Sequence, residues 1–227
     1  MPNRFTLAAL LGVAVFVITA WLMVISPKQI AHPVEGDRRD PVIAFEMVQT
    51  PDDLTAVIGE SRLQFGALRE AIDQVNRVDF LYMTVYGAFI ALFFSAVAQA
   101  RNDRRWLVAS VLGIVALLAD MRENMALLQM TQDGAEVLPL IDMLFVATWT
   151  KWFALGLASL AAGYAIYSDM RMPYLRMFGG IFGVAAFAFT LSAYFHPLRF
   201  AQMMALGIFL VWIIQVIYAY RVSRMPG

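Results

Sequence analysis

The stretch Met177–Tyr220, MFGGIFGVAAFAFTLSAYFHPLRFAQMMALGIFLVWIIQVIYAY, decides the fold of this chain because it contains two long apolar runs. The runs are separated only by His196–Arg199, and Arg199 is the single charged residue of the whole stretch. About 20 mainly apolar residues in a helix cross the roughly 30 Å hydrocarbon core of a bilayer. Because proline ends a helix, Pro197 predicts that two membrane-spanning helices meet here in a tight hairpin.

Four further apolar runs extend this pattern over the chain of 227 residues, of which 61% are hydrophobic and 15% are charged. In soluble domains about a quarter of the residues are charged. The repeated alternation of apolar and polar residues that is typical of a membrane β-barrel is absent from the sequence. The sequence therefore predicts an all-α integral membrane protein, a six-helix transmembrane bundle that forms a single domain over residues 1–227. The predicted spans are about 5–25, 80–100, 106–128, 143–167, 177–195 and 200–220.

Basic residues in the short connections indicate the orientation of these spans. Arg101, Arg105, Arg171 and Arg176 lie in connections on one side, whereas the short connections on the other side carry almost none. The positive-inside rule then predicts that both termini are cytoplasmic, in a multi-pass protein of the plasma (inner) membrane. The first run is expected to be a retained anchor, because it is longer than a signal-peptide core and no clear cleavage site follows it.

The outer loop, residues 26–79, is the one sizeable segment outside the predicted spans. Asp40-Pro41 and Thr50-Pro51 are typical helix starts, and Gly59 is a plausible helix end. From Ser61 onward an amphipathic helix is expected to run into the second span. Its two faces are set by apolar Leu63, Ala67, Ile72 and Val75 and by polar Arg69, Glu70 and Asp73. Two interpretations stay open: a cap that shields the bundle, or a lid over an outward-facing cavity.

Charged residues inside the predicted spans are costly and mark candidate sites. Asp120 lies about 22 Å along the third span, and Glu123 and Asn124 follow on the same helix face. Lys151 lies about 14 Å along the fourth span, which runs in the opposite direction. Because the loop between these spans is short, the two helices are expected to be neighbours, so that Lys151 is able to reach Asp120.

Two more polar stripes lie at similar depth, on the second and fourth spans, and all three fall in the outer half of the bilayer. The stripes contain more carboxylates than cations, which suggests water, a proton or a cationic group in the site. The alternative is a buried ion-pair network that sets helix register. The candidate ligand or proton site comprises Asp79, Tyr82, Tyr86, Asp120, Glu123, Asn124, Thr148 and Lys151.

Other chemistries find little support in the sequence. The absence of cysteine excludes disulfides and thiolate chemistry. The two histidines, His32 and His196, lie in separate outer segments without metal-ligand spacing, so no metal site is expected and the cofactor is left unknown. A net charge of zero gives no indication of nucleic acid binding. Gly179 and Gly183 form a G-x-x-x-G pattern that predicts close helix packing, more typically within the chain than between copies.

Three functional hypotheses follow from the sequence. The first is an outward-facing polar pocket that binds or moves a small molecule, a lipid headgroup or a proton. The second is an accessory or structural subunit of a larger membrane complex, and the third is an intramembrane lipid-modifying enzyme. The expected partners are membrane lipids, with other membrane subunits or a second copy of the chain as further candidates. Whether the protein is an enzyme stays open.

Overall fold

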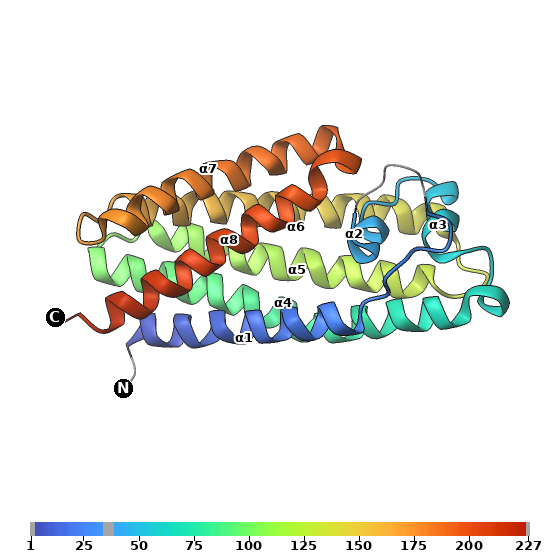
Figure 1. The fold of residues 1–227 in the computed structure, drawn as a ribbon, viewed down its shortest axis with the longest axis horizontal. Coiled ribbons are helices and arrows are strands. Elements are labelled where there is room, and N and C mark those ends of the chain that lie inside the picture. The colour runs from blue at the N-terminus through green and yellow to red at the C-terminus, as the bar shows by residue number, and fades with distance from the viewer. Residues whose placement is uncertain (1–2, 34–38, 226–227) are drawn as a thin grey trace.

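The computed structural model describes residues 3–33 and 39–225, and all regular secondary structure in these residues is helical (Figure 1). Six long helices form a bundle, and two short helices lie at one end of it. The bounds are α1 Arg4–Ile25, α2 Pro41–Glu46, α3 Pro51–Ile58, α4 Arg62–Arg101, α5 Trp106–Met130, α6 Val137–Tyr167, α7 Pro173–Phe195 and α8 Pro197–Ser223. The predicted hairpin around Pro197 is present as the junction between α7 and α8.

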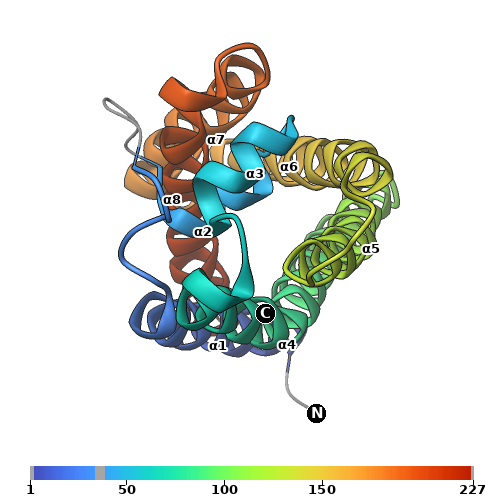
Figure 2. The ribbon, with the colours of Figure 1, turned by 90° about the vertical axis from the view of Figure 1, so that its right-hand side faces the viewer.

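The long helices are arranged in a closed ring, seen end-on in Figure 2. α4, α5, α6 and α7 each pack against the next helix in the chain, and α1 closes the ring between α4 and α8. Both chain ends lie at the same end of the bundle, here called the terminal end. α2 and α3 lie at the opposite end, here called the capped end, which is the position expected of the predicted cap.

The helical membrane bundle predicted from the sequence is confirmed, although the number of spans differs. Five helices are long and apolar enough to cross a membrane, namely α1, α4, α6, α7 and α8. α5 is as well embedded in the ring as its neighbours α4 and α6. It is not among the five because every stretch of 18 residues in it contains Asp120, Arg122 and Glu123.

The second predicted span is only the last part of α4, a helix of 40 residues that starts in the outer loop. The expected amphipathic helix is therefore confirmed, with a local irregularity at Phe65 (φ −116°, ψ 24°). Its faces were predicted wrongly near the start, where Leu63 is 99% exposed while Arg69 and Asp73 are buried. The reason is that these two charged side chains meet polar partners from α3 and from the loop after α5, described below.

The short helices begin where the sequence indicated. The Asp40 side chain accepts a hydrogen bond from the backbone of Val42, and Thr50 forms a reciprocal capping box with Asp53. α3 ends at Gly59, whose φ of 74° is a conformation that glycine adopts without strain. Of the irregular stretch predicted before Asp40, residues 34–38 lie outside the described residues.

Glycines allow α6 and α7 to approach until their backbones touch. A Cβ atom added at Gly163 would lie 2.5 Å from the Gly179 carbonyl oxygen and 2.9 Å from the Gly183 Cα. The G-x-x-x-G pattern is thus used within the chain, as the sequence predicted. The contact places α6, which carries Lys151, in a close and rigid pair with α7.

Candidate functional site

Lys151 lies near the middle of α6 with its side chain 5% exposed, and three carboxyl groups surround its ammonium group. The Nζ atom lies 3.1 Å from Glu46 Oε2 and 3.3 Å from Asp120 Oδ1, and it donates a short hydrogen bond to Glu123 Oε1. The indole ring of Trp152 flanks the same atom, 4.9 Å from the ring centre. Glu46, Asp120, Glu123 and Lys151 are here called the Lys151 cluster.

Helix geometry explains how α5 and α6 form most of this cluster. Asp120 and Glu123 are three residues apart and therefore project from the same face of α5. The short connection between α5 and α6 makes these helices antiparallel neighbours, so that Lys151 faces both carboxyls. The sequence-based expectation that Lys151 reaches Asp120 is met by this geometry.

Tyr86 connects the cluster to α4. Its hydroxyl donates a 2.6 Å hydrogen bond to Asp120 Oδ2. Its ring stacks on Trp212 of α8, with 5.6 Å between ring centres, and meets Tyr82 edge-on at 5.4 Å. Tyr82 in turn accepts a hydrogen bond from Thr19 of α1. The aromatic side chains beside the cluster therefore include Trp212, which was not selected from the sequence because it lies in the apolar run 203–214.

The remaining candidates lie at the edge of the same region. Asn124 donates a 2.7 Å hydrogen bond to Asp79 Oδ2, which joins α5 to α4. Thr148 donates to the backbone carbonyl of Glu46 at 3.3 Å, which ties α6 to α2. All eight residues selected from the sequence thus belong to one contiguous polar region.

Glu46 is the member that the sequence reasoning missed. It is the last residue of α2, outside the spanning helices, and its side chain is 12% exposed. Burial raises the pKa of its carboxyl, against the opposing effect of the Lys151 ammonium. The one available signal was a single glutamate within the apolar run Val42–Val48. A helix of six residues is too short for its periodicity to show which side chain faces inward.

The charges of the Lys151 cluster do not balance. Among the described residues, three carboxyl groups contact one ammonium group. A further carboxyl group, that of Asp79, accepts a hydrogen bond from Asn124, the residue after Glu123 on α5. Glu123 Oε2 is buried and accepts no hydrogen bond from any described residue. Within residues 3–33 and 39–225, no group of acidic or histidine side chains is arranged to hold a metal ion. Lys151 itself occupies the position between the carboxyls that a cation would take.

A second polar group, centred on the buried side chains of Arg69 and Asp73, lies at the capped end and is built differently. Arg69 donates to the carbonyl oxygens of Ile58, Gly59 and Thr131 and forms a 3.0 Å ion pair with Asp133. Asp73 accepts from Arg62 at 2.7 Å and from the Thr131 hydroxyl at 2.6 Å. This group joins α3, α4 and the loop after α5, and it is here called the Arg69 cluster, comprising Arg62, Arg69, Asp73, Thr131 and Asp133.

Comparisons of this chain with protein-family models, with curated proteins and with solved structures found no match. The roles of the Lys151 cluster are therefore argued from its own chemistry. A buried site with surplus carboxyl groups, an ammonium group and a tyrosine hydroxyl is able to hold, donate and accept protons.

Proposed function

We propose that this membrane protein takes up and releases a proton at the Lys151 cluster, in exchange with water at the capped end. The observation that carries this proposal is the presence of three buried carboxyl groups on one ammonium group. The sequence suggested a small molecule, a lipid headgroup or a proton as the ligand. Of these three, only the proton needs no additional space between side chains that are already in contact.

Electrostatics favours a proton in the cluster. Two like charges about 6 Å apart repel by roughly 3 kcal/mol at an effective dielectric constant of about 20. One ammonium group neutralises only one of the carboxylates that contact Lys151, so full ionisation leaves at least two negative charges in a buried site. Adding a proton removes one of them, and carboxyl groups that face a bundle interior commonly act in proton relays.

Glu46 supplies the route to water in this proposal. It is the one cluster member that lies in the outer loop, where it belongs to a short helix at the capped end rather than to a spanning helix. α2 is held to α6 by the contact between Glu46 and Lys151 and by the hydrogen bond from Thr148. Movement of α2 would expose Asp120 and Glu123 to the aqueous side, as the lid interpretation of this loop requires.

Infrared spectroscopy of the protein in lipid tests the proposal directly. We expect the C=O stretch of a protonated carboxyl to be present at pH values above the usual glutamate pKa of about 4.3, because burial raises the pKa of Glu46. Glu46→Gln should change this band, whereas Glu70→Gln, which alters an exposed carboxyl on α4, should not. If no protonated carboxyl is detected across this range, the proposal is wrong.

A second candidate function is an accessory subunit in which the cluster only holds helices together. It is favoured by the fact that Lys151 contacts residues of both α2 and α5 from its own helix α6. This reading predicts that the protein co-purifies with stoichiometric membrane partners under gentle solubilisation. Isolation as a lone chain with a titrating carboxyl band would favour the proton site instead.

We also propose that the terminal end faces the cytoplasm of a plasma (inner) membrane. Support comes from Arg101, Arg105 and Arg171, which lie in the connections at that end. Because the chain lacks cysteine, single cysteines report the orientation without background labelling. An impermeant maleimide should label Glu136→Cys at the capped end in intact cells and spare Arg104→Cys. The reverse pattern would invert the orientation.

A further inference from the structure

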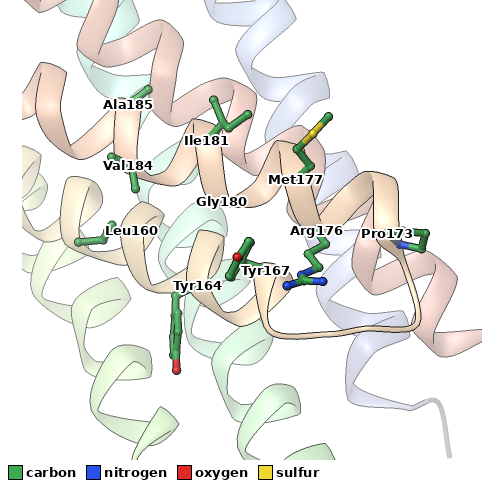
Figure 3. Close-up of a pocket in the computed structure, with 10 residues that line it drawn as sticks. All are labelled: Leu160, Tyr164, Tyr167, Pro173, Arg176, Met177, Gly180, Ile181, Val184 and Ala185. Carbon is green, nitrogen blue, oxygen red and sulfur yellow. The ribbon is translucent and has the colours of Figure 1, made fainter.

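A groove of about 790 Å³ lies between α6 and α7 in the half of the bundle near the terminal end (Figure 3). Its walls are formed by Leu160, Tyr164 and Tyr167 from α6 and by Arg176, Gly180 and Val184 from α7. All but Arg176 present carbon-rich surfaces. The groove is on the outside of the ring of helices, where a membrane protein meets lipid.

The length of the groove corresponds to one leaflet of a bilayer. Its lining on α7 extends from Pro173 to Ala185, which is about 18 Å at a rise of about 1.5 Å per residue. Half of the hydrocarbon core is about 15 Å thick. An acyl chain lying along this groove would therefore reach from the membrane surface to about the midplane.

Arg176 lies at the surface end of the groove and has no counter-ion among the described residues. Its guanidinium lies 4.6 Å from the centre of the Tyr167 ring, and its Nε atom is buried without a hydrogen-bond partner in the described chain. Asp169, the acidic residue of the same connection, is engaged by Arg171 at 2.7 Å and by the Tyr218 hydroxyl. The guanidinium thus retains donors suited to a phosphate group.

Two sets of glycines keep the groove open and its floor rigid. A Cβ atom at Gly180 would lie 3.0 Å from the Tyr167 ring, so the glycine leaves room beside that ring. Gly163, Gly179 and Gly183 hold the backbones of the two helices in contact beneath it. The groove is therefore a feature of packed helices rather than of adjustable side chains.

We propose that this groove binds one anionic phospholipid, with an acyl chain along α6 and α7 and the phosphate at Arg176. Because Arg176 is the only charged side chain that lines the groove in the described part of the chain, a headgroup with net negative charge is bound in preference to a zwitterionic one. Basic pockets between spanning helices are a recognised mode of anionic lipid binding. The site is separate from the Lys151 cluster and does not depend on the function proposed for it.

Native mass spectrometry of the full chain, with added phosphatidylglycerol or phosphatidylcholine, tests the proposal. We expect the wild-type protein to retain one phosphatidylglycerol in preference to phosphatidylcholine. Arg176→Gln should weaken phosphatidylglycerol binding about fivefold, the effect of one basic residue near a membrane surface. Arg104→Gln is the matched control, because it removes an exposed arginine from the same end and should leave binding unchanged.

Val184→Trp tests the acyl-chain part of the site. Val184 is 60% exposed, so a larger side chain fills the groove without entering the core. Both lipids should then be retained less, whereas Arg176→Gln should affect only the anionic one. Equal retention of the two lipids by the wild-type protein would overturn the proposal. Equal losses in Arg176→Gln and Arg104→Gln would overturn it too, since they would show attraction by overall charge.

Discussion

The Arg69 cluster and the Lys151 cluster are each centred on a buried cationic side chain, yet they satisfy its charge in opposite ways. Arg69 spreads its donors over the backbone carbonyls of Ile58, Gly59 and Thr131 and pairs with Asp133 at 3.0 Å. Lys151 meets three carboxyl groups at once. The first cluster contains two guanidinium groups for two carboxylates, and the second contains one ammonium group for three.

The difference separates a structural cluster from a candidate proton site. A buried network whose donors and acceptors are all paired loses stability when any member is changed. A network with surplus negative charge should tolerate, or even favour, the loss of one carboxylate. The same chemical substitution is therefore expected to have different effects in the two clusters, and four experiments use this contrast.

Lys151→Met should have the largest effect. It leaves the buried carboxyls of Glu46, Asp120 and Glu123 without their cation, and removing one partner of a buried pair costs about 3–5 kcal/mol. The loss should shrink as the pH falls, because protonated carboxyls no longer need a counter-charge. Unfolding in mixed micelles at several pH values measures this dependence. A loss that is the same at every pH would indicate that the carboxyls do not take up protons.

Arg69→Met should come next, with a loss of about 3 kcal/mol that is constant across neutral pH. It strands buried carbonyl oxygens at the end of α3, and such unmade hydrogen bonds cost about 1–3 kcal/mol each. Arg77→Gln is the control on the same helix, since its pair with Glu70 is exposed and worth less than about 1 kcal/mol. Similar losses of unfolding free energy in the two variants would show that the Arg69 cluster does not stabilise the fold more than an exposed ion pair does.

Asp73→Asn and Asp120→Asn form a matched pair with a smaller effect. Asp73→Asn weakens charge-assisted bonds from Arg62 and Thr131 and should cost about 2 kcal/mol. Asp120→Asn removes one surplus negative charge, and its amide oxygen still accepts from Tyr86. Lys151 loses one acceptor, because the amide NH2 group then faces it, but it keeps Glu46 and Glu123, so stability should change by about 1 kcal/mol. If Asp120→Asn proves as damaging as Asp73→Asn, the contrast between the clusters is unfounded.

Glu46→Gln should have the smallest effect on stability, less than about 1 kcal/mol, and a clear effect on pH dependence. Because burial raises the pKa of Glu46, docking of α2 is strongest below the usual glutamate value of about 4.3 and weakens as the pH rises through the raised value. Amide hydrogen exchange in α2, referenced to α3, should therefore quicken with pH in the wild-type protein. The glutamine variant should lose this dependence.

The sequence predicted the parts of this molecule that follow from one helix at a time. Apolar runs of spanning length gave the helical membrane bundle, and the spacing of Asp120, Glu123 and Asn124 gave their common face on α5. The short loop before α6 was enough to bring Lys151 to Asp120. Helix ends extended beyond the predicted spans, since a helix continues past the hydrocarbon wherever its backbone hydrogen bonds continue.

The parts that the sequence did not predict depend on contacts between distant segments. Glu46 enters the cluster because a six-residue helix folds back over the capped end, and nothing in its own spacing specifies that position. Arg69 and Asp73 looked like a solvent-facing stripe and are buried because α3 and Thr131 cover them. α5 was predicted as a span despite Asp120 and Glu123, and these two charges are tolerated because Tyr86 and Lys151 of the neighbouring helices supply partners.

α4 connects these two regions by a single helix, and this has a mechanical consequence. Asp73 and Tyr86 lie on it about 20 Å apart at about 1.5 Å per residue, and the irregularity at Phe65 precedes both of them. A helix without an intervening hinge transmits torsion, so a twist applied to its aqueous turns would rotate Tyr86 against Asp120. α4 therefore couples the capped end mechanically to the buried carboxyls of the Lys151 cluster. Arg77→Pro would remove this coupling, because proline interrupts a helix.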